Sequence, residues 1–201
     1  MIRRLKSQVG QAAPLYITAV TGLLFLALVF FAFGEADVKR NGAQTAADAT
    51  ALAAAKDSRK LLKFDLMAHV MDRGFYTEVF NTPYVGMDGC PMGRAFAAKN
   101  DANEVECQPV GDMRWGYQVD LKSRKRMSAN LVPGTEGKKA EAEAVAVLDN
   151  RGCTFVPNPI PTSPSIGTVG CLSGLVWVVS PQSLAVMPDM TLLFDVRLAE
   201  D

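Results

Sequence analysis

A long uncharged segment near the N-terminus limits what this chain can fold into. From Ala12 to Gly34 the sequence holds no charged residue and consists mainly of Leu, Phe, Ala, Val, Ile and Thr. A helix needs about 20 apolar residues to cross the hydrocarbon core of a bilayer. Such a helix also satisfies its backbone hydrogen bonds internally, which a lipid environment requires. The sequence therefore predicts a transmembrane helix over residues 12–34.

The charges beside this apolar run predict its orientation. Three basic residues precede the run, whereas residues 35–40 mix both signs. The more basic side of a membrane helix usually faces the cytoplasm. We expect residues 1–11 to form a cytoplasmic basic leader and everything after residue 34 to lie outside the cytoplasm. The chain is then a single-pass protein of the cell membrane.

Two kinds of N-terminal processing compete with a retained anchor. A cleaved secretory signal has a shorter apolar region and small residues at its exit, and residues 34–36 are the nearest candidate here. The length of the apolar run favours an anchor over such a signal. Prepilin processing removes a basic leader after a glycine, and the bond between Gly10 and Gln11 has the right place for it.

The sequence beyond the apolar run predicts that the helix continues outside the membrane. Residues 35–73 contain no proline and are rich in good helix formers such as alanine, leucine and lysine. We expect one nearly continuous helix from Pro14 to about Asp72, roughly 90 Å long at 1.5 Å per residue. Alanine falls on all its sides over residues 43–55, which indicates either close packing with several neighbours or helix propensity alone.

Residues 74–201 predict a small α+β domain with an antiparallel sheet. We expect a short helix over residues 89–100 and strands over residues 104–110, 114–122, 141–149, 175–180 and 191–199. The proline-rich stretch 156–170 predicts a surface loop. The helix face that packs against this domain is expected to consist of Phe64, Met67, Ala68, Met71 and Phe75, which recur at helical spacing.

All four cysteines follow the membrane segment: Cys90, Cys107, Cys153 and Cys171. An even number outside the cytoplasm predicts two disulfides, and four cysteines allow three pairings that spacing alone does not separate. The sequence has neither a CxxC motif nor a cluster of cysteine and histidine, so no zinc site is expected.

The N-terminal quarter of the chain resembles a known family. Residues 44–53 read Gln-Thr-Ala-Ala-Asp-Ala-Thr-Ala-Leu-Ala, which is similar to the Gln-x-Ala-Ala-Asp-Ala-x-Ala-Leu-Ala pattern of TadE/TadG-like proteins of the tight-adherence (Tad/Flp) pilus apparatus. Residues 90–107 resemble the Cys, Ala-x-x-Phe-Ala, Asn-x-Ala and Cys arrangement of small actinobacterial members.

The resemblance implies a pilin-like architecture and a structural or assembly role as a minor pilin-like subunit of a Tad/Flp-type pilus or related secretion system. Its partners would be other pilus or pseudopilin subunits, contacted through the helix at Gln44, Ala47, Asp48 and Leu52. The second motif implies a Cys90–Cys107 disulfide, which leaves Cys153 to pair with Cys171.

Two departures limit what this resemblance implies. Larger TadG-like proteins often carry an Asp-x-Ser-x-Ser metal site, which this chain lacks, so metal-dependent adhesion is not expected. Processed pilins carry a glutamate five residues after the cleaved glycine, and Leu15 stands there, followed by Tyr16. This difference counts against prepilin cleavage.

The residues that carry chemistry in other proteins form no catalytic pattern here. The single histidine, His69, has no partners that would orient it, and neither a nucleophile elbow nor a glycine-rich phosphate loop is present. We expect no enzymatic activity, no cofactor and no small-molecule substrate. With 21 basic and 21 acidic residues there is no net charge to attract nucleic acid, whereas the lipid bilayer is an expected partner.

One alternative is a membrane-tethered surface module that binds a cell-wall or extracellular ligand. It predicts exposed aromatic side chains at Trp115, Tyr117 or Trp177, whereas aromatic residues more commonly fill a core. A basic run at residues 121–126 predicts a solvated turn, with contact to a cell-wall polymer as the second interpretation.

Overall fold

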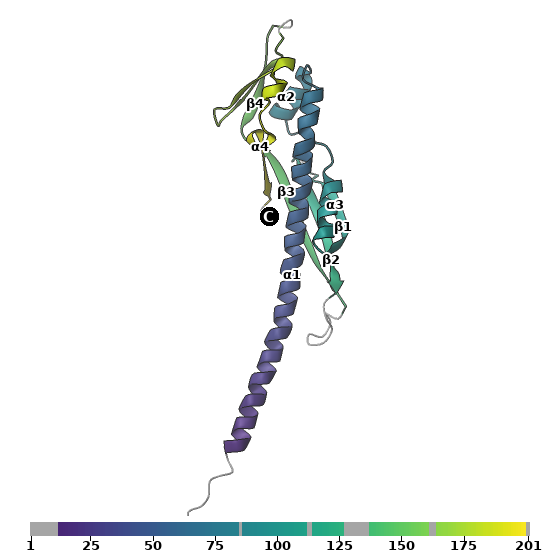
Figure 1. Cartoon of the computed structure of the whole chain (residues 1–201), viewed down its shortest axis with the longest axis vertical. Helices are drawn as coiled ribbons and strands as arrows, with labels where there is room; N and C mark the ends of the chain where they lie inside the picture. Colours follow the sequence, from purple (N-terminus) through teal and green to yellow (C-terminus); the bar gives the residue numbers. More distant parts are fainter. Residues whose placement is uncertain (1–11, 85, 112–113, 127–136, 161–163, 200–201) are drawn as a thin grey trace, which may run out of the picture.

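The computed structural model describes residues 12–84, 86–111, 114–126, 137–160 and 164–199. The molecule is a rod built on one helix, α1 (Ala12–Ala68), and all other elements pack along its C-terminal half (Figure 1). No residue in the window Ala13–Phe31 is buried, and this window is long and apolar enough to cross a membrane. The α+β fold with a long N-terminal apolar helix is thus confirmed.

The long helix ends at Ala68, four or so residues before its expected end at Asp72. The difference arises because Asp72 caps a new helix, α2 (Arg73–Asn81), by accepting a hydrogen bond from the amide of Phe75. An aspartate at this position satisfies an amide that the first helical turn leaves unpaired. The chain therefore turns back at the distal end of α1.

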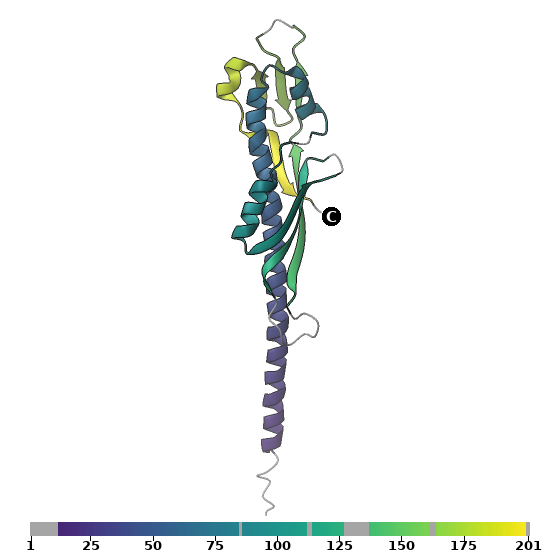
Figure 2. The same ribbon diagram turned by 90° about the vertical axis from the view of Figure 1, so that its right-hand side faces the viewer.

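Two antiparallel sheets complete the domain. The first has the order β1-β2-β3-β7 and lies along α1, and the second has the order β4-β5-β6 and lies at the distal tip (Figure 2). The remaining elements are β1 (Ala102–Pro109), β2 (Gly116–Arg126), β3 (Lys139–Asn150), β4 (Cys153–Pro157), β5 (Gly167–Cys171), β6 (Val176–Val179), β7 (Phe194–Leu198), α3 (Cys90–Lys99), α4 (Met190–Leu193) and the 3-10 helix η1 (Pro181–Val186).

The first sheet buries one face. Along β2 the side chains of Tyr117, Val119 and Leu121 are buried, while Gln118 and Asp120 between them are partly exposed. Because neighbouring side chains of a strand point to opposite faces, the buried set lies on one side of the sheet. That side meets α1, which contacts both β2 and β3.

The expected loop over residues 156–170 is wrong at both ends. Val156 pairs with Thr168 and Pro157 pairs with Gly167, so β4 and β5 form a hairpin. Pro157 is tolerated because β4 is an edge strand, where a missing N–H need not leave a ladder bond unmade. The strand expected over residues 191–199 is also shorter, because Asp189 caps α4 before β7 begins at Phe194.

The expected packing face of the helix is wrong except at Phe75, which belongs to α2 and packs against the core. Phe64, Met67 and Met71 remain 57%, 40% and 57% exposed, whereas Leu62 and Leu66 are fully buried. Both sets recur at helical spacing, so periodicity alone does not separate them. The choice follows from the side on which the domain approaches, where the Tyr76 hydroxyl donates to the carbonyl of Leu66 at 2.9 Å.

Candidate functional site

The alanine-rich segment of α1 is buried within the chain's own fold. Its buried residues are Ala43, Ala46, Ala47, Thr50, Ala51, Ala53, Ala54 and Ala55. These residues lie on different sides of the helix. They are all buried because the first sheet covers one side of α1 and α3 covers another. The small side chains let both elements approach the helix backbone closely. Of the two explanations for the alanines, close packing therefore holds within this chain.

Two glycines allow α3 to lie against α1. A Cβ atom added at Gly89 would lie 1.9 Å from the carbonyl oxygen of Ala54. One added at Gly93 would lie 3.1 Å from the carbonyl oxygen of Thr50 and 3.2 Å from the Cβ of Ala54. Our sequence reasoning missed this contact, although glycines four residues apart at the start of a helix are a signal for close helix packing.

The disulfide between Cys90 and Cys107 joins this helix to β1, and a second joins Cys153 to Cys171 across the β4–β5 pair. These are the pairs that the resemblance implies. Each ties the ends of a short excursion of the chain, which restricts the unfolded state.

A buried hydrogen-bond network holds the segment before α3 against α1. The hydroxyl of Ser58, which is fully buried, donates to the carbonyl of Met87 and accepts from the indole Nε1 of Trp115 at 3.0 Å. The Tyr117 hydroxyl also donates to Met87 and accepts from the amide of Gly89 at 3.2 Å. Buried polar groups need such partners, so the network fixes this segment in one position.

The structure places the four expected assembly residues in different settings. Gln44 is exposed, and its Nε2 donates to Asp48 Oδ1 at 3.0 Å and to the carbonyl of Glu143 at 2.9 Å, which links α1 to β3. Ala47 is completely buried, and Asp48 and Leu52 are partly exposed. Gln44 thus joins α1 to the chain's own sheet, Asp48 accepts a hydrogen bond from Gln44, and Ala47 is buried within the chain's own fold.

Leu52 instead borders an accessible hollow beside α3. This hollow of about 390 Å³ is lined by Ala49, Leu52, Ala53, Lys56, Asp57, Lys60, Met92 and Phe96. Met92 and Phe96 are 41% and 40% exposed, so two large apolar side chains of α3 face solvent here. An apolar hollow along a helix suits another helix better than a small polar ligand. We name this surface the α1–α3 hollow.

The aromatic residues that would mark a ligand-binding sheet face fill the core instead. Trp115, Tyr117 and Trp177 are only 5%, 1% and 3% exposed. The Tyr76 ring lies 6.1 Å from that of Trp177 and 5.4 Å from that of Phe155. The feature that would favour a stand-alone binding module is therefore not found at these three positions.

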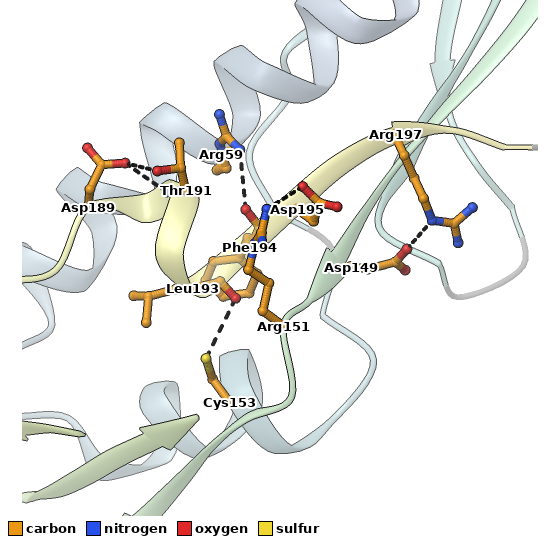
Figure 3. A network of polar contacts seen from close by, with 10 residues as sticks. All are labelled: Arg59, Asp149, Arg151, Cys153, Asp189, Thr191, Leu193, Phe194, Asp195 and Arg197. Carbon is orange, nitrogen blue, oxygen red and sulfur yellow. Dashed lines mark hydrogen bonds and ion pairs between the residues drawn. The ribbon is translucent and has the colours of Figure 1, made fainter. Parts of the chain in front are cut away.

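Polar contacts near the C-terminal strand hold it in place (Figure 3). Arg59 of α1 donates to the carbonyl of Phe194 at 3.2 Å, and Arg151 pairs with Asp195 at 2.7 Å. Asp189 accepts from the amide and hydroxyl of Thr191, and these bonds hold the pKa of its carboxyl below the usual range. The Arg151–Asp195 pair is about half exposed, so it contributes little to stability.

His69 is exposed at the distal end of α1. Its Nδ1 lies 2.9 Å from the carbonyl of Asp65 and its ring packs on Phe75 at 4.5 Å. Among the described residues, no group of three or more His, Cys, Asp or Glu side chains is arranged to hold a metal ion. Gly10 and Gln11, at the candidate cleavage site, lie outside the described residues.

The similarity of this chain to a known protein family lies in α1 and the residues just before it. Residues 10–57 match the model of the Tad family, described as "Putative Flp pilus-assembly TadE/G-like". This match confirms the resemblance of the N-terminal segment, while the resemblance of residues 90–107 stays a prediction. No curated protein and no solved structure matches the chain. The matched residues contain both the candidate membrane span and the whole alanine-rich segment.

Proposed function

Over residues 10–57 the chain carries the TadE/G-like segment of the Flp pilus-assembly family, and from this premise we propose that it is a minor pilin-like structural or assembly subunit. It acts in a Tad/Flp-type pilus or a related secretion system and is not an enzyme. The observation that carries the proposal is the continuity of α1, in which an uncovered apolar segment runs without a break into the helix that organises the domain.

The proposed topology follows from the charges and the cysteines. Residues 1–11 are cytoplasmic, residues 12–34 cross the membrane, and the helical extension and the domain lie outside. Two disulfides are expected in an oxidising compartment rather than in the cytosol, which supports this orientation. The basic leader supports it independently.

We propose that other pilus or pseudopilin subunits bind along the accessible side of α1, at the α1–α3 hollow. Ala47 is enclosed by the chain's own fold, whereas Ala49 and Leu52, which line the hollow, are partly exposed. Contact with a neighbouring helix would cover the apolar side chains of Met92 and Phe96, which burial from water stabilises.

Site-specific photocrosslinking in native membranes tests this assignment. A crosslinking residue at Ala49 or Leu52 should capture other Tad/Flp subunits. The same residue at Ala47 should react only within the chain, provided that the domain still folds. If crosslinkers at several accessible positions of the hollow capture no Tad/Flp component, the assembly role is wrong.

The intact mass of the protein from native membranes shows whether the leader is cleaved. A chain that starts at Met1 is an uncleaved anchor, which favours an assembly factor. A chain that starts at Gln11 has been processed as a prepilin and should be sought in the filament. In either case, two disulfides predict a gain of about 4 Da on reduction.

A further inference from the structure

The end of the β2–β3 hairpin lies beside α1 close to the candidate membrane span. Lys39 of α1 donates from Nζ to the carbonyl of Arg126, the last residue of β2, at 2.9 Å. In Figures 1 and 2 the hairpin points along α1 toward its N-terminal end. Lys39 lies about eight residues beyond Phe31, the end of the apolar window, which is roughly 12 Å along a helix. The basic run of the sequence therefore ends near the membrane surface.

The charges at this hairpin end are unevenly balanced. Farther from the membrane, Lys122 pairs with Glu141 at 2.9 Å and Arg124 lies 3.8 Å from Asp101. Lys139 lies opposite Arg126 in the sheet and pairs with Glu104. These contacts neutralise one another locally.

Nearer the membrane, positive charge dominates. The basic residues there are Lys39, Arg40, Lys125, Arg126 and Lys138, all exposed except Lys39, which is partly exposed. The acidic residues of the adjoining helix are Glu35 and Asp37. One open hollow between α1 and the hairpin is lined by more basic than acidic residues, namely Arg40, Lys122, Arg126, Lys138 and Lys139 against Asp37, Glu104 and Glu141. We name the five basic residues Lys39, Arg40, Lys125, Arg126 and Lys138 the juxtamembrane cluster.

We propose that the juxtamembrane cluster binds the anionic headgroups of the lipid leaflet on the domain's side of the membrane. The proposal rests on the proposed function in one respect, namely that α1 crosses the bilayer. The headgroup layer extends about 5–8 Å beyond the hydrocarbon core. Long basic side chains reach toward it, and the remaining gap is within the Debye length of about 8 Å at physiological ionic strength.

This contact gives the basic run a physical role. A basic residue near an anionic surface is worth about 1 kcal/mol, which is about fivefold in affinity. Several such residues on a hairpin bonded to α1 hold the domain at a defined height and limit the tilt of the rod. The cluster is thus a second membrane contact beside the apolar helix.

The test uses the full chain reconstituted in vesicles of phosphatidylcholine containing about one third phosphatidylglycerol. Spin-labelled forms of both lipids report which one the protein immobilises preferentially. We expect the wild type to prefer phosphatidylglycerol several-fold at low salt and less at high salt. K125Q/R126Q should lose most of this preference. K63Q/R73Q removes the same charge from the distal end of the rod, about 35 Å farther from the membrane, and it should behave as wild type.

Extraction of the vesicles with alkaline carbonate separates the possible failures. If the chain is extracted, α1 is not inserted, and both the anchor of the proposed function and the lipid contact are wrong. If the chain is inserted but the wild type and K125Q/R126Q select lipids equally, only the lipid contact is wrong. An equal loss in both double variants also overturns it, because net charge rather than the cluster then sets the preference.

Discussion

The contact between α3 and α1 makes Gly89→Ala a sharp test of the fold. The new Cβ would lie 1.9 Å from the carbonyl oxygen of Ala54, 2.8 Å from its carbonyl carbon and 3.1 Å from the amide nitrogen of Ser58. All three atoms belong to the backbone of α1, so no side-chain rotation relieves the clash. Gly89 itself has φ −91° and ψ −2°, a conformation open to alanine. The effect is therefore one of space, and α3 must move away from α1.

The magnitude follows from the atoms involved. Overpacking a well-packed interior costs about 1–3 kcal/mol, and backbone clashes belong at the upper end. The displacement also weakens the hydrogen bond from the Gly89 amide to Tyr117, worth about 1 kcal/mol. We expect a total loss of about 3 kcal/mol. In a chain of this size, that lowers the melting temperature by about 6–12 °C.

Thermal unfolding of the full chain in detergent measures this effect. The fluorescence of Trp115 and Trp177, both buried, reports the loss of the domain core. Gly42→Ala is the matched control, because the new Cβ would meet nothing within 4 Å. That change in an exposed helix should stabilise the chain by up to about 1 kcal/mol. A Gly89→Ala protein that melts within about 2 °C of the wild type would refute the close packing of α3 on α1.

Three further predictions concern the domain. Ser58→Ala leaves the indole N–H of Trp115 without its partner and should cost about 1–3 kcal/mol in urea unfolding, whereas Ser173→Ala should be close to neutral because Ser173 is exposed. Replacing both cysteines of either disulfide by serine should cost about 3 kcal/mol, and equal urea midpoints for wild type and variant would contradict this. Asp189→Ala should cost about 1 kcal/mol at pH 7, since Asp189 caps α4. Because the folded-state pKa of Asp189 is lowered, this contribution is present above the usual aspartate pKa of about 4 and disappears as the pH falls through the lowered value, so the two urea midpoints should converge in acid.

Local sequence patterns correctly predicted several elements of the fold. The short helix expected over residues 89–100 is found as α3 at Cys90–Lys99, because proline at its start and helix formers after it act locally. The strand expected over residues 141–149 lies within β3, where alternating side chains match one buried face. The distal sheet was recognised only at residues 175–180, because proline in an edge strand reads as a loop signal.

The candidate site was also predictable from the sequence only in part. The Gln-x-Ala-Ala-Asp pattern identified the segment of α1 that a family model also matches. It could not show that Gln44 bonds to the backbone of β3 or that Ala47 is buried by the chain's own fold, since both depend on residues far apart in the sequence. Met92 and Phe96, which line the α1–α3 hollow, were missed because a ten-residue helix has no local sign of what lies beside it.

The sequence by itself determined the long helix and its apolar window, because helix propensity and hydropathy act through neighbours in the chain. Tertiary structure alone decided which side of that helix the domain covers. Leu62 and Leu66 became core while Phe64 and Met67 stayed exposed, although all four are apolar residues of one helix. The physical reason is that burial depends on the direction from which the sheets and α3 approach. That direction is set jointly by glycines at the α1–α3 contact, by the disulfides and by strand pairing.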